Sequence, residues 1–441
     1  MKSYFKSSFF IVLLLLLTVA QPSLLSESSE NKEIVLHVDD DNIKGPWDGS
    51  AIYPFQTIPD AINASSSKAM IYVHHGIYDE HIIIQKPLTL IGETKEKTII
   101  KQTSPDSMIL IQHTHQVTIT NFTIQNNNTM NQNETGILIK NTTTSVISQS
   151  IIEGFTQGIS ITDQSKNNII YDTIIRGNDI GLTLSESNKN LVYANTFSDN
   201  TIQFILTNTK QNRINENCFI HEQQKPTFIN SQDIIDHNYW GKTTLFYVIF
   251  GLQTINLIDI TLTWLKCDWH PAQSKDELQT NPLIRMNTTR GTMIFELYQE
   301  KMPLTCENFI NLSKIEFFEG LVFHRVIDDF VIQGGGYDVN GTRKESPFGP
   351  IDLETHPEVN HVDGAISMAR TQDPNSATSQ FFVCDGKQET LDGKYAAFGV
   401  ILIGFDVLRD IASVETTTKH GFMKNWPIDD IIITSTSVIS K

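Results

Sequence analysis

The middle of the chain repeats a pattern of short apolar runs. Between residues 136 and 220, runs rich in β-branched residues recur with a period of 22 to 23, as in GISIT (158–162) and NIIYDTII (168–175). Asn, Asp, Gly and Ser separate the runs. The runs are too short for helices, and a period of this length is typical of a solenoid. We therefore predict that each repeat forms three short strands and three turns, which is one coil of a parallel β-helix.

The turns of the repeat carry asparagines at corresponding positions, namely Asn167, Asn190 and Asn212. Asn tolerates left-handed backbone, and amides stacked from coil to coil can hydrogen-bond to one another, so a structural role is expected. By the same count Asp172 should stack on Asn195 and Asn217 in a polar ladder. Such a ladder contains no pair of carboxylates, and the other acidic residues of the repeats are scattered.

The segments that precede the repeats, from residue 34 to residue 93, extend the same strand-and-turn pattern, and residues 57–64 are expected to form a short helix that caps the open end of the core. With NYWGK (238–242) and DWHPA (268–272) near its end, the region 34–272 resembles the right-handed β-helix family of pectin-lyase-like and NosD-like repeat proteins. The resemblance implies a fold and leaves the activity open.

Two further apolar segments could be taken for membrane spans. Residues 244–265 contain Gln253, Asn256 and Asp259, which are costly in hydrocarbon, so strands are expected there. At the N-terminus, lysines precede a short apolar run that ends before Ala20, which predicts an export signal at 1–20, followed by a polar linker at 21–33. An uncleaved anchor remains the alternative. After cleavage no stable membrane span is expected.

Beyond Pro271 the repeats stop. Residues 273–283 form a polar linker, and residues 284–441 have the length of one further domain. GTMIFELY (291–298) is expected to be a strand and PLTCENFINLSK (303–314) a helix in which Phe309 and Leu312 share a face.

Three segments of this second region carry a resemblance. FHRVIDDFVIQGGG (323–336), DGAISMARTQDPNSATSQFFV (363–383) and LDGKYAAFGVI (391–401) together resemble the cyclophilin family of peptidyl-prolyl isomerases. The resemblance runs from about Leu283 to Ser440 and implies a closed eight-stranded β-barrel with two capping helices. The fold class expected for the whole chain is therefore mainly β, a parallel β-helix followed by this barrel.

Prolyl isomerisation breaks no covalent bond. Rotation about an X-Pro amide is slow because resonance is lost, with a barrier of about 18 to 20 kcal/mol, so a catalyst need only favour the twisted state. A fixed guanidinium aimed at the amide can do this at any relevant pH, because arginine stays charged. No proton transfer is needed, so His324 is expected to be structural.

The resemblance assigns the residues. As catalytic residues it implies Arg325, Phe330 and Gln333. As substrate-binding residues it implies Val331, Ala369, Arg370, Thr371, Gln380, Phe382, Leu391 and Tyr395, with residues 369–371 acting largely through backbone groups. Tyr395 stands where many members have His, and Thr390 where many have a tryptophan that binds cyclosporin. The first departure should alter sequence preference, and the second should weaken inhibition by that drug.

Composition narrows the partners and cofactors. Acidic residues outnumber basic ones by 50 to 33, and the net charge of −17 argues against nucleic acid as a partner. The four cysteines form no metal-binding motif, although a single bridge between Cys218 and Cys267 stays open. Asp39 to Asp41 could hold a cation, although a solvated turn is expected there, and the pairs His74-His75 and His113-x-His115 lack a third ligand at diagnostic spacing. We expect no metal and no cofactor.

The chain is thus predicted to be an exported prolyl isomerase that assists folding outside the cytoplasm, in the envelope, at the cell surface or after secretion. Its clients would be proline-containing polypeptides, and its β-helix would bind or display a surface glycan or protein. The alternative is a carbohydrate-active or carbohydrate-binding β-helix protein with an accessory cyclophilin domain. Release of sugars from polysaccharides would favour that alternative.

Overall fold

A computed structural model describes residues 35–101, 107–126, 134–242, 244–255, 260–278 and 280–439. The chain divides into residues 1–34 and one compact unit, Val35–Lys441. The predicted export signal and the linker after it lie outside the described residues. Within the described ranges, no helix combines the length and the apolar character needed to cross a membrane.

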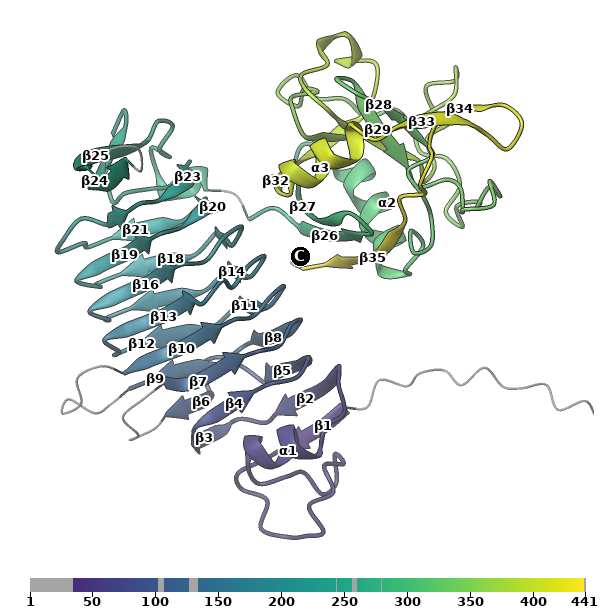
Figure 1. The fold of residues 1–441 in the computed structure, drawn as a ribbon. Coiled ribbons are helices and arrows are strands. Elements are labelled where there is room, and N and C mark those ends of the chain that lie inside the picture. The colour runs from purple at the N-terminus through teal and green to yellow at the C-terminus, as the bar shows by residue number, and fades with distance from the viewer. Residues whose placement is uncertain are drawn as a thin grey trace, which may run out of the picture. The chain divides into compact units, whose positions relative to one another are not determined.

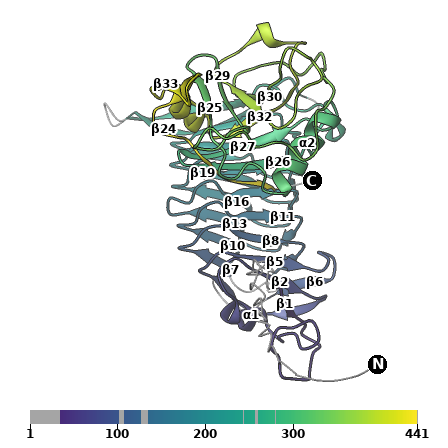
Figure 2. The same ribbon diagram turned by 90° about the vertical axis from the view of Figure 1, so that its right-hand side faces the viewer.

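The first part of the compact unit is a solenoid of three β-sheets, whose coils are stacked in Figure 1 and Figure 2. The first sheet consists of β1 (Val35–Val38), β2 (Ala69–Val73), β5 (Leu88–Gly92), β8 (Val117–Thr120), β11 (Val146–Ser148), β14 (Ile169–Tyr171), β17 (Leu191–Tyr193), β20 (Lys210–Asn215) and β23 (Gln232–Asp236). The second sheet consists of β4 (Ile82–Ile84), β7 (Ser107–Gln112), β10 (Thr135–Lys140), β13 (Gln157–Thr162), β16 (Ile180–Ser185), β19 (Ile202–Thr207), β22 (Thr227–Ile229), β24 (Tyr247–Ile255) and β25 (Ile260–Asp268). The third sheet consists of β3 (Gly76–Asp79), β6 (Thr98–Lys101), β9 (Thr123–Gln125), β12 (Ile151–Glu153), β15 (Ile174–Arg176), β18 (Thr196–Ser198) and β21 (Cys218–Ile220).

The register of the strands follows the sequence period. Ile137 pairs with Ile159, Ile159 with Leu182, and Leu182 with Phe204, all in parallel strands of the second sheet. All four side chains are fully buried in the solenoid core. The predicted parallel β-helix is confirmed, because residues one period apart lie side by side.

The repeated glycines have a steric cause. A Cβ atom on Gly158 would lie 2.7 Å from the carbonyl oxygen of Gly181, and one on Gly136 would lie 2.6 Å from that of Gly158. Adjacent coils approach too closely at this position for any side chain that points there. Glycine therefore recurs because of close backbone approach.

Stacked side-chain amides connect the coils at the predicted Asn190 and Asn212, and one residue away from the predicted Asn167. The Nδ2 of Asn168 donates to Oδ1 of Asn190 at 3.0 Å, and Asn190 donates in the same way to Asn212 at 3.0 Å. Asn167 instead has a left-handed backbone with φ 57°. The prediction that Asn167 joins the ladder is therefore wrong, because the left-handed turn and the ladder need different conformations and fall on neighbouring residues.

The second ladder is shifted in the same way. The backbone N–H of Thr173 donates to Oδ1 of Asn195 at 3.0 Å, and Nδ2 of Asn195 donates to Oδ1 of Asn217 at 3.0 Å. Asp172 has φ 45° and does not take part, contrary to the prediction. In these three coils the ladder position is thus held by a threonine and two asparagines.

Each end of the solenoid core is covered. Helix α1 (Ile58–Ala64) lies at the first coils and buries Ile58, Ala61 and Ile62, as predicted for a cap. At the other end the ring of Trp240 stacks on that of Tyr247, with centroids 3.8 Å apart. The apolar segment after residue 244 forms the antiparallel pair β24 and β25, so strands replace any span there, as predicted.

The thiols of Cys218 and Cys267 are both free, so the bridge left open between them is not present. Cys218 lies on β21 in the third sheet and Cys267 on β25 in the second sheet. Their strands thus belong to different walls of the solenoid.

After the short 3-10 helix η1 (Lys275–Glu277), the chain forms a curled eight-stranded sheet. In spatial order it contains β28 (Arg325–Ile327), β29 (Val331–Gly334), β31 (Phe381–Cys384), β30 (Ala365–Met368), β32 (Ala397–Ile403), β27 (Gly291–Leu297), β26 (Leu283–Thr288) and β35 (Ile433–Val438). The other elements are α2 (Pro303–Lys314), α3 (Phe405–Ala412), the 3-10 helix η2 (Glu389–Leu391) and the hairpin of β33 (Thr416–Lys419) and β34 (Met423–Pro427).

Backbone hydrogen bonds join the two ends of this sheet. The N–H of Phe323, just before β28, donates to the carbonyl of Ile431 at 3.0 Å, and the N–H of Ile433 on β35 donates to that of Leu321 at 2.8 Å. Helix α2 has the predicted bounds, and its Phe309 is buried against Phe381 at 5.4 Å between ring centroids. We call this region the barrel.

The solenoid and the barrel share a small apolar cluster inside the compact unit. Inward residues of the first sheet, such as Ile170, belong to the solenoid core, whereas Ile169 and Leu191 point outward and pack with Leu283 and Ile403 of the barrel. This is why β11, β14 and β17 are buried at every position. The boundaries proposed for the linker, 273–283, stay a prediction.

A buried carboxylate lies beside the shared cluster. Oη of Tyr193 donates to Oε1 of Glu296 at 2.9 Å, and Nδ2 of Asn281 donates to the same oxygen at 2.9 Å. Burial raises the pKa of Glu296 above its ordinary value. At the edge, Nζ of Lys189 lies 2.6 Å from Oδ2 of Asp406.

Candidate active site

The barrel strands bring three polar and aromatic side chains together. Arg325 on β28 pairs with Gln333 on β29, and Gln333 pairs in turn with Phe382 on β31. Residues directly opposite in antiparallel strands point to the same face of a sheet. Arg325, Gln333 and Phe382, which come from two distant segments, therefore form one row. Within this row Nη1 of Arg325 donates to Oε1 of Gln333 at 3.3 Å.

A tight turn between β28 and β29 aims Phe330 at this row. The N–H of Phe330 donates to the carbonyl of Ile327 at 3.2 Å, and Asp329 has a left-handed backbone with φ 55°. Oδ2 of Asp385 accepts from the N–H of Asp329 at 2.9 Å and fixes the turn. The guanidinium carbon of Arg325 lies 5.7 Å from the centre of the Phe330 ring.

The floor beside the arginine is apolar. Val331 and Phe382 are buried, and they form a small cluster with Ala369, Leu391 and Tyr395. The ring of Tyr395 meets that of Phe382 edge to face, with centroids 5.8 Å apart. Such a floor suits an apolar ring of the size of proline.

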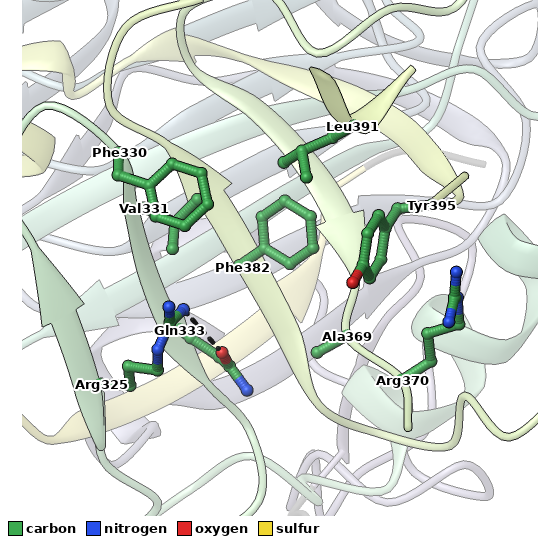
Figure 3. A pocket seen from close by; sticks show the side chains of 9 residues that line it. All are labelled: Arg325, Phe330, Val331, Gln333, Ala369, Arg370, Phe382, Leu391 and Tyr395. Carbon is green, nitrogen blue, oxygen red and sulfur yellow. Dashed lines mark hydrogen bonds between the residues drawn. The ribbon is translucent and has the colours of Figure 1, made fainter. Parts of the chain in front are cut away.

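These side chains line one pocket of about 150 Å³, shown in Figure 3. The lining residues are Arg325, Phe330, Val331, Gln333, Ala369, Arg370, Phe382, Leu391 and Tyr395. A cavity of roughly 150 Å³ can hold benzene, so the pocket has room for a ring of the size of proline.

Two of the predicted site residues do not line this pocket. Gln380 stands behind Gln333 and accepts from its Nε2 at 3.1 Å. Thr371 is exposed, and its hydroxyl lies 2.7 Å from that of Ser376. Arg370 lines the pocket, and its guanidinium donates to the carbonyl oxygen of Thr371; the backbone role expected for residues 369–371 stays a prediction.

Burial shapes the charges around the pocket. Desolvation lowers the pKa of Arg325, yet a guanidinium remains protonated in proteins. Burial also lowers the pKa of His324 to about 4, so this imidazole is neutral at neutral pH. Its ring packs against Tyr337 with centroids 4.8 Å apart and does not line the pocket, which agrees with the structural role expected for it.

The sequence did not predict His361, which packs against Phe382 of the pocket floor. The ring of His361 stacks on Phe382 with centroids 5.9 Å apart. Its Nδ1 lies 2.8 Å from Oδ1 of Asp392 and its Nε2 lies 3.0 Å from Oγ of Ser367. No local pattern marks His361, because its partners come from the turn after η2 and from β30.

The three consecutive glycines after Gln333 serve packing. A Cβ on Gly335 would lie 2.7 Å from the carbonyl oxygen of Ser379, and one on Gly336 would lie 2.6 Å from the Gln380 side chain. The backbone of this turn therefore lies directly on the neighbouring strand. Gly335 also has φ 80°, a conformation that favours glycine.

Other clusters of acidic groups among the described residues have structural partners. Asp39, Asp40 and Asp41 lie close enough to share a cation, and Oδ2 of Asp40 accepts from the N–H of Ile77 at 2.9 Å. A second group joins Asp328 and Asp329 to Asp385, whose carboxylate pairs with Arg409 of α3.

In comparisons with known proteins, one family model matches the barrel and another matches most of the solenoid. The family model described as cyclophilin type peptidyl-prolyl cis-trans isomerase/CLD matches residues 283–438. The model described as periplasmic copper-binding protein (NosD) matches residues 49–253.

Three peptidyl-prolyl isomerases are each similar to about a third of the chain. A peptidyl-prolyl cis-trans isomerase of Acinetobacter baylyi is 38% identical over 165 residues, which are 36% of this chain and 87% of that protein. Peptidyl-prolyl cis-trans isomerase B of Escherichia coli is 33% identical over 164 residues, 35% of this chain and 99% of that protein. The crystal structure of a Cryptosporidium parvum cyclophilin type isomerase in the presence of the dipeptide Ala-Pro has 33% identity, a TM-score of 0.33, and coverage of 36% of this chain and 99% of that one.

Proposed function

We propose, starting from the fact that this chain belongs to the cyclophilin family of peptidyl-prolyl cis-trans isomerases, that the pocket around Arg325 catalyses rotation about Xaa-Pro bonds of client polypeptides outside the cytoplasm. The observation that carries the proposal is the row of Arg325, Gln333 and Phe382 on three neighbouring strands, beside a pocket of proline size.

The proposed mechanism uses charge and shape. The proline ring occupies the floor made by Val331 and Phe382, with Phe330 as one wall. The guanidinium of Arg325 then donates to the amide as its nitrogen becomes pyramidal, which favours the twisted state over the planar one. Gln333 accepts from Arg325 and so holds the donor toward the pocket. Rotation is faster because the resonance lost in the twisted amide is offset by this hydrogen bond.

Arg325→Ala is the direct test. Loss of a donor that acts in the transition state typically costs about 100-fold or more in rate, so kcat/KM for cis-to-trans rotation of an Xaa-Pro peptide should fall by that much. Arg343→Ala is the matched control, because Arg343 is exposed and pairs with Glu345 away from the pocket. Equal, uncatalysed rates in the wild type and Arg325→Ala would refute the proposal.

Export is the second element of the proposed function. The lysines and the apolar run before Ala20 support it, and the description of the solenoid family names a periplasmic protein. Residues 1–33 fused to a reporter enzyme that is active only outside the cytoplasm should yield activity. Sequencing the N-terminus of the recovered protein then distinguishes a cleaved signal from an anchor, and a silent reporter would contradict export.

The solenoid supports a second candidate function, binding of a surface glycan. Amide side chains, including Gln164, Asn188, Asn208 and Gln232, line a groove of about 480 Å³ on its surface. Amides offer donors and acceptors together, which suits sugar hydroxyl groups. A glycan array probed with the full chain and with Gln164→Ala/Gln232→Ala should show binding that the double variant loses. Sugar release by the full chain would favour a carbohydrate-active enzyme over a binding module.

A further inference from the structure

The side chain of Arg370 is held rigidly at the edge of the pocket. Its Nε and Nη2 donate to the carbonyl oxygen of Lys394 at 3.2 and 3.0 Å, and its Nη1 donates to that of Thr371 at 2.8 Å. The guanidinium carbon lies 4.5 Å from the centre of the Tyr395 ring. An arginine on a surface is normally mobile, whereas this one is fixed by three hydrogen bonds and an aromatic ring.

The fixed guanidinium keeps donors to spare. Arginine has five N–H groups, and three of those on Arg370 are used by carbonyl groups. One N–H on each terminal nitrogen is therefore left without an acceptor among the described residues. No described carboxylate lies within ion-pair distance of Arg370 either, in contrast to Arg409, which pairs with Asp363 and Asp385.

The two arginines of the pocket lie on opposite sides of its floor. Figure 3 shows Arg325 and Gln333 on one side of Phe382, and Tyr395 and Arg370 on the other. A client whose proline ring rests on Phe382 between them must place a flanking residue near Arg370.

We propose that Arg370 determines client specificity by binding the carboxylate of an acidic residue that flanks the isomerised proline. The two spare N–H groups match the two oxygens of a carboxylate, and their fixed position lowers the entropy lost on binding. The inference rests on the proposed isomerase function, and it names the client class of that same pocket: acidic residues beside proline.

Peptide pairs test this assignment. We would measure kcat and KM of the full chain for peptides with Glu-Pro and Gln-Pro, and for a second pair with Pro-Glu and Pro-Gln. An ion pair at a partly exposed site is worth up to about fivefold, so one Glu peptide should have a KM about threefold to fivefold lower than its Gln partner, with kcat little changed. Raised salt should remove the difference.

Variants identify the residue that is responsible. Arg370→Met should abolish the preference for Glu, so that the KM for the Glu peptide rises to that for its Gln partner measured with the same variant. Arg370→Lys should retain only part of it, because lysine keeps the charge but not the planar group that reaches both carbonyls. Arg343→Met, on an exposed arginine away from the pocket, should leave it unchanged.

The outcomes separate this inference from the isomerase proposal. Equal KM values for Glu and Gln peptides in both series, or a preference that survives Arg370→Met, overturn the role of Arg370 even if all peptides are isomerised. If no peptide is turned over, the isomerase proposal fails. Binding of the same peptides, followed by NMR shifts of the Arg370 side chain, then still decides whether Glu is preferred.

Discussion

Individual side chains in the barrel act through the environment that the fold gives them. Arg325 and His324 are neighbours in the chain, yet Arg325 lines the pocket and His324 is buried against Tyr337. Alternation along an extended strand sends adjacent side chains to opposite faces, which explains the separation. The sequence predicted both roles. It did not predict His361, because that residue supports Phe382 only after distant segments have met.

Because His324 stays neutral, we expect activity to be independent of its titration, so kcat/KM should be flat from about pH 6 to 9. Stability should behave differently. The pKa of His324 falls from 6.5 in the unfolded chain to about 4 in the folded chain. Its contribution to stability is therefore complete above pH 6.5 and is lost as the pH falls toward 4.

The size of this loss is about 3 kcal/mol, since one pKa unit corresponds to roughly 1.4 kcal/mol. Denaturant unfolding, monitored by isomerase activity, should show this loss of unfolding free energy for the wild type. The control His115→Gln, which changes an exposed histidine of the solenoid, should show the same loss. His324→Phe should flatten the profile between pH 6.5 and 4. The same slope in His324→Phe would contradict this assignment.

The strands of the solenoid follow the period of 22 to 23 residues that is visible in the sequence. Because this period varies by one residue, it does not identify which residue of a turn joins a ladder. Asn167 and Asn168 are adjacent asparagines, and only their backbone conformations show that the second one joins Asn190. The error of one residue at Asp172 has the same origin. Each turn needs one left-handed residue and one inward amide, and composition does not tell which neighbour takes which role.

The amide ladder should be costly to interrupt. Asn190 is fully buried, donates to Asn212 and accepts from Asn168, so Asn190→Ala leaves several buried polar groups without partners. Each such group costs roughly 1 to 3 kcal/mol, and we expect a loss of at least about 3 kcal/mol in the free energy of unfolding. Gln232→Ala, at an exposed position of β23, should change it by less than about 0.5 kcal/mol. Equal free energies of unfolding for the two variants, measured in urea, would show that the hydrogen bonds of Asn190 do not stabilise the solenoid.

In the whole molecule the solenoid and the barrel are joined by a contact surface that forms only when both regions are present. Outward residues Ile169 and Leu191 of the solenoid pack with Leu283 and Ile403 of the barrel, and the buried Glu296 of the barrel lies beside them. Packed together they form a buried contact in which Tyr193 and Asn281 satisfy the carboxylate. A buried acid needs such donors, because desolvation is otherwise uncompensated.

This contact predicts a pH-dependent stability of the fused chain. The pKa of Glu296 is raised in the folded protein, so its contribution to stability is complete below the ordinary value of 4.5 and is lost as the pH rises through the raised value. Glu296→Gln should remove that loss, as measured by denaturant unfolding across the pH range above 4.5. An unchanged pH profile in Glu296→Gln would show that the carboxylate is not buried in solution.

Tyr193→Phe tests the same contact at constant pH. It removes the donor to Glu296 without creating a large cavity, and a cost of about 1 to 3 kcal/mol is expected. Tyr53→Phe, at an exposed tyrosine, is the control and should have no measurable effect. Isomerase activity should be preserved in both variants, because neither residue lines the pocket.

The two fold types, the helix at 303–314 and most of the pocket residues could be predicted from the sequence, because strand period and long motifs are local properties of a chain. The tertiary structure alone decided which asparagine joins a ladder, that Arg370 is fixed over Tyr395, and that Glu296 is buried. These features depend on contacts between residues far apart in the chain. Their energies arise from burial and from hydrogen-bond geometry, which exist only once the chain has folded.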